Sequence, residues 1–134
     1  MFEFVVYGKP QGKARPRVAK GHAFTPERTR LYERDIKAAF LKRYWGMPRL
    51  HEAVCLKLYI GFEIPKSWSK TKKEQAKAGK IRPTVKPDID NIVKVYMDAL
   101  NGLAWDDDKQ VTALYVFKSY ELQGRVKVMI DEHY

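Results

Sequence analysis

The chain has 134 residues, a length that favours one compact domain over residues 1–134. Hydrophobic residues make up 45% of it and aromatic residues 13%, which is enough for a core and excludes global disorder. The 26 Lys and Arg outnumber the 16 Asp and Glu, giving a formal net charge of +10. This excess of cations points to a polyanionic partner, and nucleic acid is the first candidate.

Cysteine content and hydropathy indicate the cellular compartment of the protein. The single cysteine, Cys55, excludes an intramolecular disulfide and fits a reducing compartment. The first apolar residues give way at once to Gly8-Lys9-Pro10, so no secretion signal is visible, and no segment approaches the ~18 consecutive apolar residues of a membrane span. We therefore expect a cytoplasmic protein without membrane contact.

The N-terminal third predicts a strand, a loop and a helix. Apolar residues alternate along Phe2–Tyr7 as in a strand with one face on a core. The segment Gly8–His22 contains no acid and several cations, and we interpret it as a basic loop. Thr25 as N-cap and Pro26 in the first helical position predict a helix that ends at about Trp45.

The middle of the chain predicts a strand followed by a strongly basic segment. Alternation over Val54–Phe62 gives the clearest strand of the sequence. Pro65–Lys86 carries eight cations and one acid, with a short helix expected from about Ser69 to Ala78 and stopped by Gly79.

The C-terminal part predicts a helix and a hairpin. Apolar residues form a continuous stripe at helical spacing from Asp88 to Asn101. Two apolar runs, Val111–Phe117 and Val126–Ile130, then predict an antiparallel hairpin. The order of elements makes this an α+β domain, a mixed or antiparallel sheet packed by helices.

The polar side of the helix over Asp88–Asn101 allows two interpretations. Asp90, Lys94 and Asp98 lie in one column, and Asp88 stands at the helix entrance. In the structural interpretation, Asp88 caps the helix and Asp90 pairs with Lys94 on the surface. Considered alone, these residues favour that interpretation.

Three further acids change the balance. Asp106–Asp108 follow the same helix after a short turn, so a basic protein concentrates its acids in one helix-turn-strand unit. Such hard oxygen ligands suit Mg²⁺ or Mn²⁺, and an acidic metal pocket within a basic surface is typical of a phosphodiesterase. Spacing excludes an EF-hand, a zinc site and a nucleotide-binding P-loop.

The motifs Lys86-Pro-Asp-Ile-Asp-Asn-Ile-Val-Lys94, Asp98-Ala-Leu100 and Asp107-Asp-Lys-Gln-Val111 resemble the signature of RusA-type Holliday-junction resolvases, a family common in prophages. The segments Gly8–Arg17 and Phe24-Thr-Pro26 are also similar to family members. The resemblance spans nearly the whole chain. It implies a small homodimeric endonuclease that uses Mg²⁺, with Mn²⁺ able to substitute, and nicks four-way DNA junctions symmetrically without a nucleotide cofactor.

Motif positions assign the site residues by resemblance. Asp88, Asp90 and Asp108 would be catalytic carboxylates that bind metal, and Asp107 a further metal ligand. Lys94 would be the catalytic lysine, a protonated group that stabilises charge. Asp106 departs from the family, which often has an apolar residue at that position.

Phosphate contacts are expected from the basic loop and the basic segment. The candidates are Lys9, Lys13, Arg15, Arg17, Lys70, Lys72, Lys73 and Lys86. For Tyr7, Trp68 and Trp105 we favour a core position over stacking on DNA. The alternative function is a non-catalytic, basic nucleic-acid-binding protein whose acids only cap helices.

Overall fold

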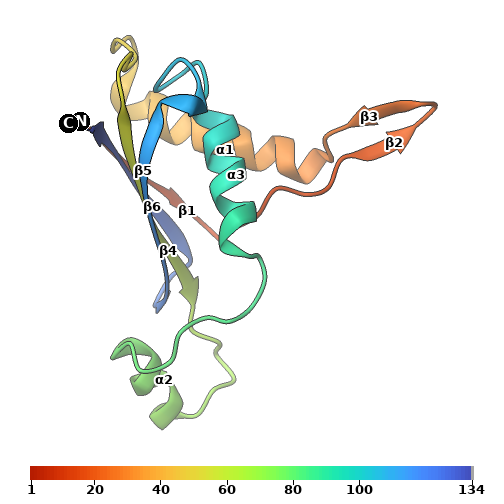
Figure 1. Ribbon diagram of the computed structural model, residues 1–134. Helices are drawn as coiled ribbons and strands as arrows, with labels where there is room; N and C mark the ends of the chain where they lie inside the picture. The colour runs from red at the N-terminus through yellow and green to blue at the C-terminus, as the bar shows by residue number, and fades with distance from the viewer. Residues whose placement is uncertain (134) are drawn as a thin grey trace.

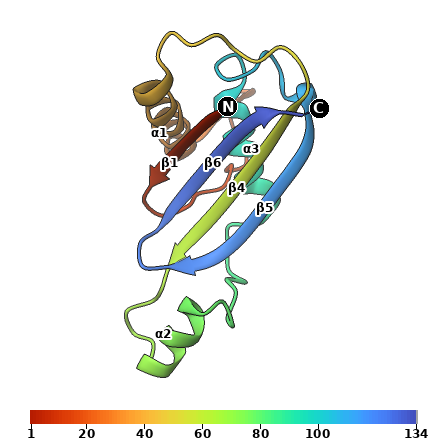
Figure 2. The same ribbon diagram turned by 90° about the vertical axis from the view of Figure 1, so that its left-hand side faces the viewer.

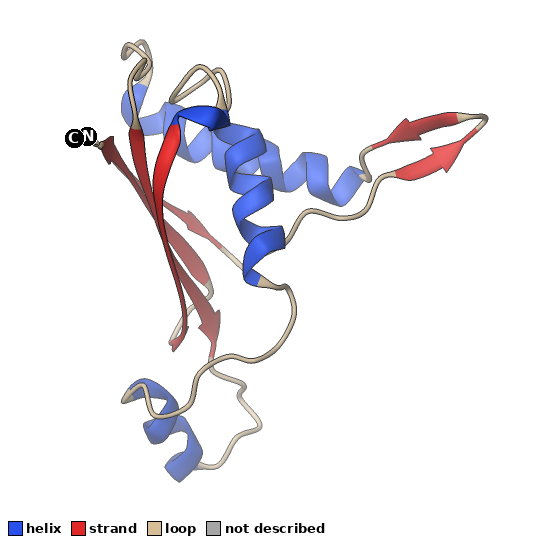
Figure 3. Ribbon diagram, in the orientation of Figure 1, coloured by secondary structure: helices blue, strands red, loops and turns tan. Residues whose placement is uncertain are grey.

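A mixed sheet covered on one face by helices forms the body of the protein (Figure 3). The computed structural model describes residues 1–133, so Tyr134, the last residue of the expected domain, lies outside the described part. In chain order the elements are β1 (Phe2–Tyr7), β2 (Arg17–Ala19), β3 (His22–Phe24), α1 (Glu27–Tyr44), β4 (Val54–Glu63), α2 (Lys70–Lys77), α3 (Ile89–Leu100), the 3-10 turn η1 (Asp108–Gln110), β5 (Val111–Glu121) and β6 (Arg125–Glu132). The predicted α+β class is confirmed.

The main sheet has the strand order β1-β6-β4-β5, with β4 and β5 parallel and the other neighbours antiparallel. Helices α1 and α3 pack on one face, and α2 lies beyond one end of the sheet (Figure 1). Seen from the left-hand side of Figure 1, the four strands lie in front of both packed helices (Figure 2). No helix within residues 1–133 covers that second face.

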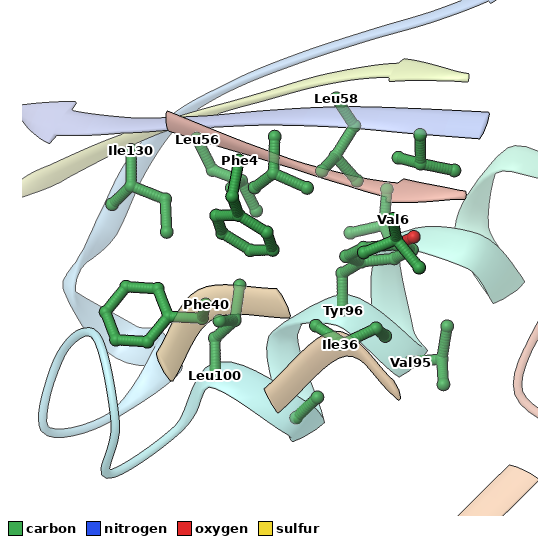
Figure 4. Packing of buried hydrophobic residues seen from close by; sticks show 14 of the residues in the cluster. Phe4, Val6, Ile36, Phe40, Leu56, Leu58, Val95, Tyr96, Leu100 and Ile130 are labelled. Atoms are coloured by element: carbon green, nitrogen blue, oxygen red, sulfur yellow. The ribbon is translucent and has the colours of Figure 1, made fainter. Parts of the chain in front are cut away.

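Strict alternation explains why the core lies on one face of the sheet. Leu56, Leu58 and Ile60 of β4 are fully buried, and the residues between them point to the other face. Strands β1 and β6 alternate in the same way. Figure 4 shows these side chains packed against the apolar stripes of α1 and α3, where Ile36 and Leu100 are fully buried.

The predicted hairpin of the two C-terminal strands is wrong. Both strands exist, but β4 lies between β5 and β6 and pairs with each of them. The central position of β4 satisfies its backbone groups on both edges, and β4 is the strand with the most buried residues. A hairpin of β5 with β6 would leave β4 at an edge of the sheet. The connection at Gly124 passes close to β1, where Gly8 N donates to Gly124 O at 2.9 Å. Alternation predicts strands but not their neighbours.

The basic loop contains a hairpin that the sequence analysis missed. Strands β2 and β3 pair around Lys20 and Gly21, which have φ values of 52° and 77°. The hairpin is exposed along its whole length and projects away from the body (Figure 1). The start of α1 also differs, because Pro26 rather than Thr25 occupies the N-cap position. The other predicted elements are confirmed, with ends shifted by a few residues.

Candidate active site

The first turn of α3 presents two acids to solvent. Its apolar stripe, which includes Ile92 and Tyr96, is buried against the sheet and α1. The opposite side of the helix therefore faces outward, and Asp88, Asp90 and Lys94 are all exposed. The packing of α3 thus determines that these polar groups share one accessible surface.

The structural interpretation expected a helix cap by Asp88 and an ion pair between Asp90 and Lys94. Neither contact is present among residues 1–133. Asp88 stands at the N-cap of α3, but its side chain makes no capping hydrogen bond. Asp90 and Lys94 do not approach within ion-pair distance in the described part of the chain. The carboxylates of Asp88 and Asp90 instead lie near the positive end of the α3 dipole. They are available to an external cation or donor.

Lys118 of β5 holds the segment that leads into α3. Its Nζ donates to Val85 O at 2.7 Å and to Pro87 O at 3.2 Å, and it lies 5.0 Å from the centre of the Phe62 ring. Lys118 was not among the site residues predicted from the sequence. A signal was present, because Lys118 interrupts the inward, mainly apolar side of a strand.

The other acids lie at the opposite end of α3. Trp105 is buried and its Nε1 donates to Asn101 Oδ1 at 2.6 Å, which fixes the turn after the helix. Asp106 is bound by His51 Nδ1 at 2.8 Å and Arg49 Nε at 3.4 Å. The hydrogen bond from His51 and the nearby charges hold the pKa of Asp106 below its usual value, against a smaller opposing effect of desolvation. Asp106 is thus engaged in ion pairs, unlike Asp107 and Asp108.

Gln110 fastens the acidic segment to the neighbouring loop. Its Oε1 accepts hydrogen bonds from Asp106 N at 2.7 Å and Asp107 N at 2.9 Å. Its Nε2 donates to the carbonyl oxygens of Leu50 and Glu52, each at 3.0 Å. The sequence predicted no role for Gln110, and these four hydrogen bonds give it a positioning role.

The carboxylates therefore form two groups within one chain. Helix α3 has 12 residues, which corresponds to about 18 Å between its ends. The length of β5 indicates a similar separation of the two acidic groups. Lys118 contacts the segment before α3, and it lies seven residues beyond Val111, about 23 Å along the strand. Residues 1–133 contain no group of three acidic, histidine or cysteine side chains that could hold a metal ion. Asp88 and Asp90 suit a hard cation, but one chain does not assemble the full predicted set.

The predicted phosphate-binding residues are mostly accessible. The side chains of Lys9, Arg15, Arg17 and Lys86 are exposed, as are Lys70 and Lys72 on α2, whereas Lys73 is half-buried. Lys72 Nζ lies 4.1 Å from the centre of the Trp68 ring, and Trp68 packs edge-on against Tyr120. Trp105 occupies the core as expected, while Tyr7 is exposed.

Lys13 differs from the other predicted phosphate contacts. Its Nζ forms ion pairs with Glu33 and Asp98, and its side chain is 17% exposed. Desolvation lowers its pKa, but hydrogen bonds and charges from these two carboxylates outweigh that effect and leave the pKa above the usual value. Lys13 is therefore already neutralised within the protein.

Comparison with known proteins identifies the family. The profile of the family described as Endodeoxyribonuclease RusA matches residues 7–131. The chain belongs to the RusA family. It is also 38% identical to the Bacillus subtilis (strain 168) protein named "Uncharacterized protein YqaN" over 136 residues, covering 97% of this chain and 95% of that protein.

Membership in the RusA family makes the chain a nuclease of the type that acts on DNA junctions. RusA nucleases generally use a divalent metal, and the oxygen-donor chemistry of Asp88 and Asp90 agrees with that use. The predicted resemblance is thereby confirmed. Within residues 1–133, no helix is long and apolar enough to cross a membrane.

Proposed function

We propose that this RusA-family chain is an Mg²⁺-dependent, structure-selective endonuclease that resolves Holliday junctions by paired symmetric nicks during recombination and repair in the cytoplasm. The observation that carries the proposal is the exposed start of α3, where Asp88 and Asp90 lack protein partners among residues 1–133. Two exposed carboxylates within one helical turn offer oxygen ligands to a hard cation. In a chain of net charge +10 they suit a metal-dependent reaction on a polyanion.

We assign the residue roles as follows. Asp88, Asp90 and Asp108 are the catalytic carboxylates that hold Mg²⁺, with Asp107 as a further ligand and Mn²⁺ as a substitute ion. The ion supplies charge neutralisation at the phosphate and a more acidic bound water. Lys94, one turn along α3 from Asp90, stabilises negative charge at the scissile phosphate.

Contacts to the DNA backbone come from the exposed cations. One group of phosphate contacts lies in the basic loop and consists of Lys9, Arg15 and Arg17. A second group lies in the basic segment and consists of Lys70, Lys72, Lys73 and Lys86. Lys13 is not in contact with phosphate, because it is paired with Glu33 and Asp98. Each lost duplex contact should flatten the dependence of log K on log salt by about 0.9. We expect a flatter slope for the combined variant Lys70→Gln, Lys72→Gln and Lys73→Gln. An unchanged slope would remove α2 from the DNA-binding surface.

We also propose that the enzyme is a homodimer. Resolution of a four-way junction needs two nicks of matched symmetry, and each chain carries one set of the predicted carboxylates. A two-fold pair presents two identical sites to the two-fold of the junction.

The test is cleavage of a synthetic four-way junction, with linear duplex as the DNA control and EDTA as the metal control. Asp90→Asn preserves side-chain size but removes a charged ligand, so we expect at least a 100-fold loss of nicking with junction binding retained. Asp35→Asn changes an exposed acid on α1 and is the matched control. Cleavage by Asp90→Asn at the wild-type rate, or by the wild type in EDTA, contradicts the proposal and favours a non-catalytic binding protein.

A further inference from the structure

The connection between α2 and α3 has little hydrogen bonding of its own. It runs from α2, beyond one end of the sheet, to the first turn of α3 (Figure 1). Among the described residues, no backbone–backbone hydrogen bond involves positions 81–87. Asp88 follows this segment directly, and its side chain makes no capping hydrogen bond with the helix. Other contacts of positions 81–87 therefore determine where Asp88 and Asp90 lie.

Lys118 supplies the hydrogen bonds that this segment otherwise lacks. Its Nζ donates to the carbonyl oxygens of Val85 and Pro87, and the described part of the chain makes no other hydrogen bond to positions 81–87. Lys118 belongs to β5, which pairs with β4, so these two bonds tie the segment to the sheet. The second carbonyl belongs to the residue directly before Asp88. One side chain thus holds the backbone that leads into the first carboxylate.

The basic loop packs closely against the same point. A Cβ added at Gly12 would lie 2.9 Å from the Cβ of Pro87 and 2.9 Å from the Cβ of Asn91, which is too short for two carbon atoms. The next residue, Lys13, donates its backbone N–H to Asn91 O at 2.9 Å. The Cβ of Pro87 cannot rotate away, because it is part of a ring. Glycine at position 12 therefore permits the close approach, and the start of α3 has little room to move.

We propose that Lys118 is a positioning residue for the metal-binding carboxylates. By fixing the backbone at Pro87, it sets the orientation of Asp88 and Asp90 toward a bound ion. Lys118 forms no ion pair with either carboxylate in the described part of the chain, so it acts on them through the backbone. Groups that orient metal ligands commonly contribute about 10- to 100-fold to metal affinity. The inference rests on the proposed function, in which these two carboxylates hold Mg²⁺.

Three possible roles of Lys118 predict different results when its charge is removed. If Lys118 acted mainly through its charge, its loss would reduce the repulsion of a metal ion and tighten metal binding. If it contacted phosphate, its loss would weaken junction binding and flatten the dependence of that binding on salt. If it positions Asp88 and Asp90, its loss weakens metal binding and leaves junction binding unchanged. The sign of the change in metal affinity therefore separates position from charge.

Mn²⁺ binding by Lys118→Met, measured by electron paramagnetic resonance of the free ion, is the direct test. Methionine keeps an unbranched apolar chain beside Phe62 but has no donor, so the variant should fold by circular dichroism. We expect the Kd for Mn²⁺ to rise at least about 10-fold, and the Kd for a four-way junction in EDTA to stay within about 2-fold of the wild-type value. Lys57→Met is the matched control. Lys57 is also half-buried on the sheet and lies 5.5 Å from the centre of the Tyr115 ring, but it makes no hydrogen bond to the segment before α3.

Amide hydrogen exchange tests the fixed backbone without metal or DNA. Ile92 N donates to Asp88 O at 3.1 Å, so the exchange rate of this amide reports on the first turn of α3. It should rise at least about 10-fold in Lys118→Met, whereas the amides of β4 should keep their wild-type rates. This local change distinguishes a loosened helix start from a general loss of stability.

Gly12→Ala is a second variant that changes no charge and leaves Lys118 intact. The added methyl group must displace Pro87 or Asn91, so it moves the same backbone by another route. Weaker Mn²⁺ binding and faster exchange at Ile92 are expected here too. Wild-type Mn²⁺ affinity in a Gly12→Ala protein with faster exchange would show that the position of the α3 start does not matter, and would overturn the inference.

Two results with folded Lys118→Met also overturn it: Mn²⁺ binding that is unchanged or tighter, and a wild-type exchange rate at Ile92. Failure of the proposed function gives a different result. A wild-type protein that binds no Mn²⁺ and nicks no junction rejects the metal-dependent nuclease, and the exchange rate at Ile92 then decides by itself whether Lys118 fixes the start of α3.

Discussion

Lys13 Nζ lies 2.9 Å from Glu33 Oε1 and 2.9 Å from Asp98 Oδ2. The three residues come from the basic loop, α1 and α3, so one side chain connects three separate segments. Nearby, Lys13 N donates to Asn91 O and Ala14 N to Thr29 Oγ1, which fastens the same loop to both helices. The base of the β2–β3 hairpin is therefore anchored beside the first turn of α3.

Replacement of Lys13 tests whether this residue stabilises the fold or contacts DNA phosphates. Lys13→Met leaves two partly buried carboxylates without their cation, so we expect the free energy of unfolding in urea to fall by about 2 kcal/mol. Lys9→Met, an exposed neighbour, should change it by less than about 0.5 kcal/mol. If Lys13→Met keeps wild-type stability but binds junctions more weakly, Lys13 is a phosphate contact instead.

Gln110 is predicted to position the acidic segment. Gln110→Ala removes four hydrogen bonds, including those to Asp106 N and Asp107 N, and we expect about 2 kcal/mol of destabilisation by urea unfolding. Below its melting temperature the variant should bind junctions normally but nick them more slowly, because Asp107 and Asp108 are no longer held in place. Gln123→Ala, in the exposed β5–β6 connection, is the control. Wild-type nicking by folded Gln110→Ala would show that the segment needs no such support.

The ion pairs of Asp106 predict a pH dependence of stability. Its folded pKa lies below the ordinary 3.8, so the ionised form stabilises the fold above pH 3.8 and this contribution disappears as the pH falls through the lower folded value. Asp106→Asn should therefore be less stable than the wild type at pH 7 and equally stable in strong acid. Thermal melts of both proteins from pH 7 to pH 2 measure the difference. A constant difference across that range would contradict the assignment.

Mixed dimers test whether the two acidic groups meet between the subunits of the proposed homodimer. Asp90→Asn and Asp108→Asn should each be inactive alone. In a mixed dimer with shared sites, one site carries both substitutions and the other carries neither, so refolding the two variants together should restore single-strand nicking. A mixture of Asp88→Asn and Asp90→Asn places one substitution in each site and should remain inactive. Recovery in neither mixture, with dimers present, would place each complete site within one subunit.

The sequence alone predicted the three helices, the strands of the main sheet and the spacing of the candidate site residues. Alternation in Val54–Phe62 and the helical stripe after Asp88 reflect burial of one face, which is a local property of the pattern. The spacing of Asp88, Asp90 and Lys94 likewise follows from helix geometry alone. These predictions required no knowledge of distant contacts.

Only the tertiary structure decided which segments meet. Strand pairing depends on competition between edges far apart in sequence, so the position of β4 between β5 and β6 could not be obtained from the apolar runs. The partners of Lys13 and the role of Lys118 also depend on how α1, α3 and β5 pack. Closeness in sequence similarly suggested one acidic cluster, whereas the rigid length of α3 separates Asp90 from Asp108.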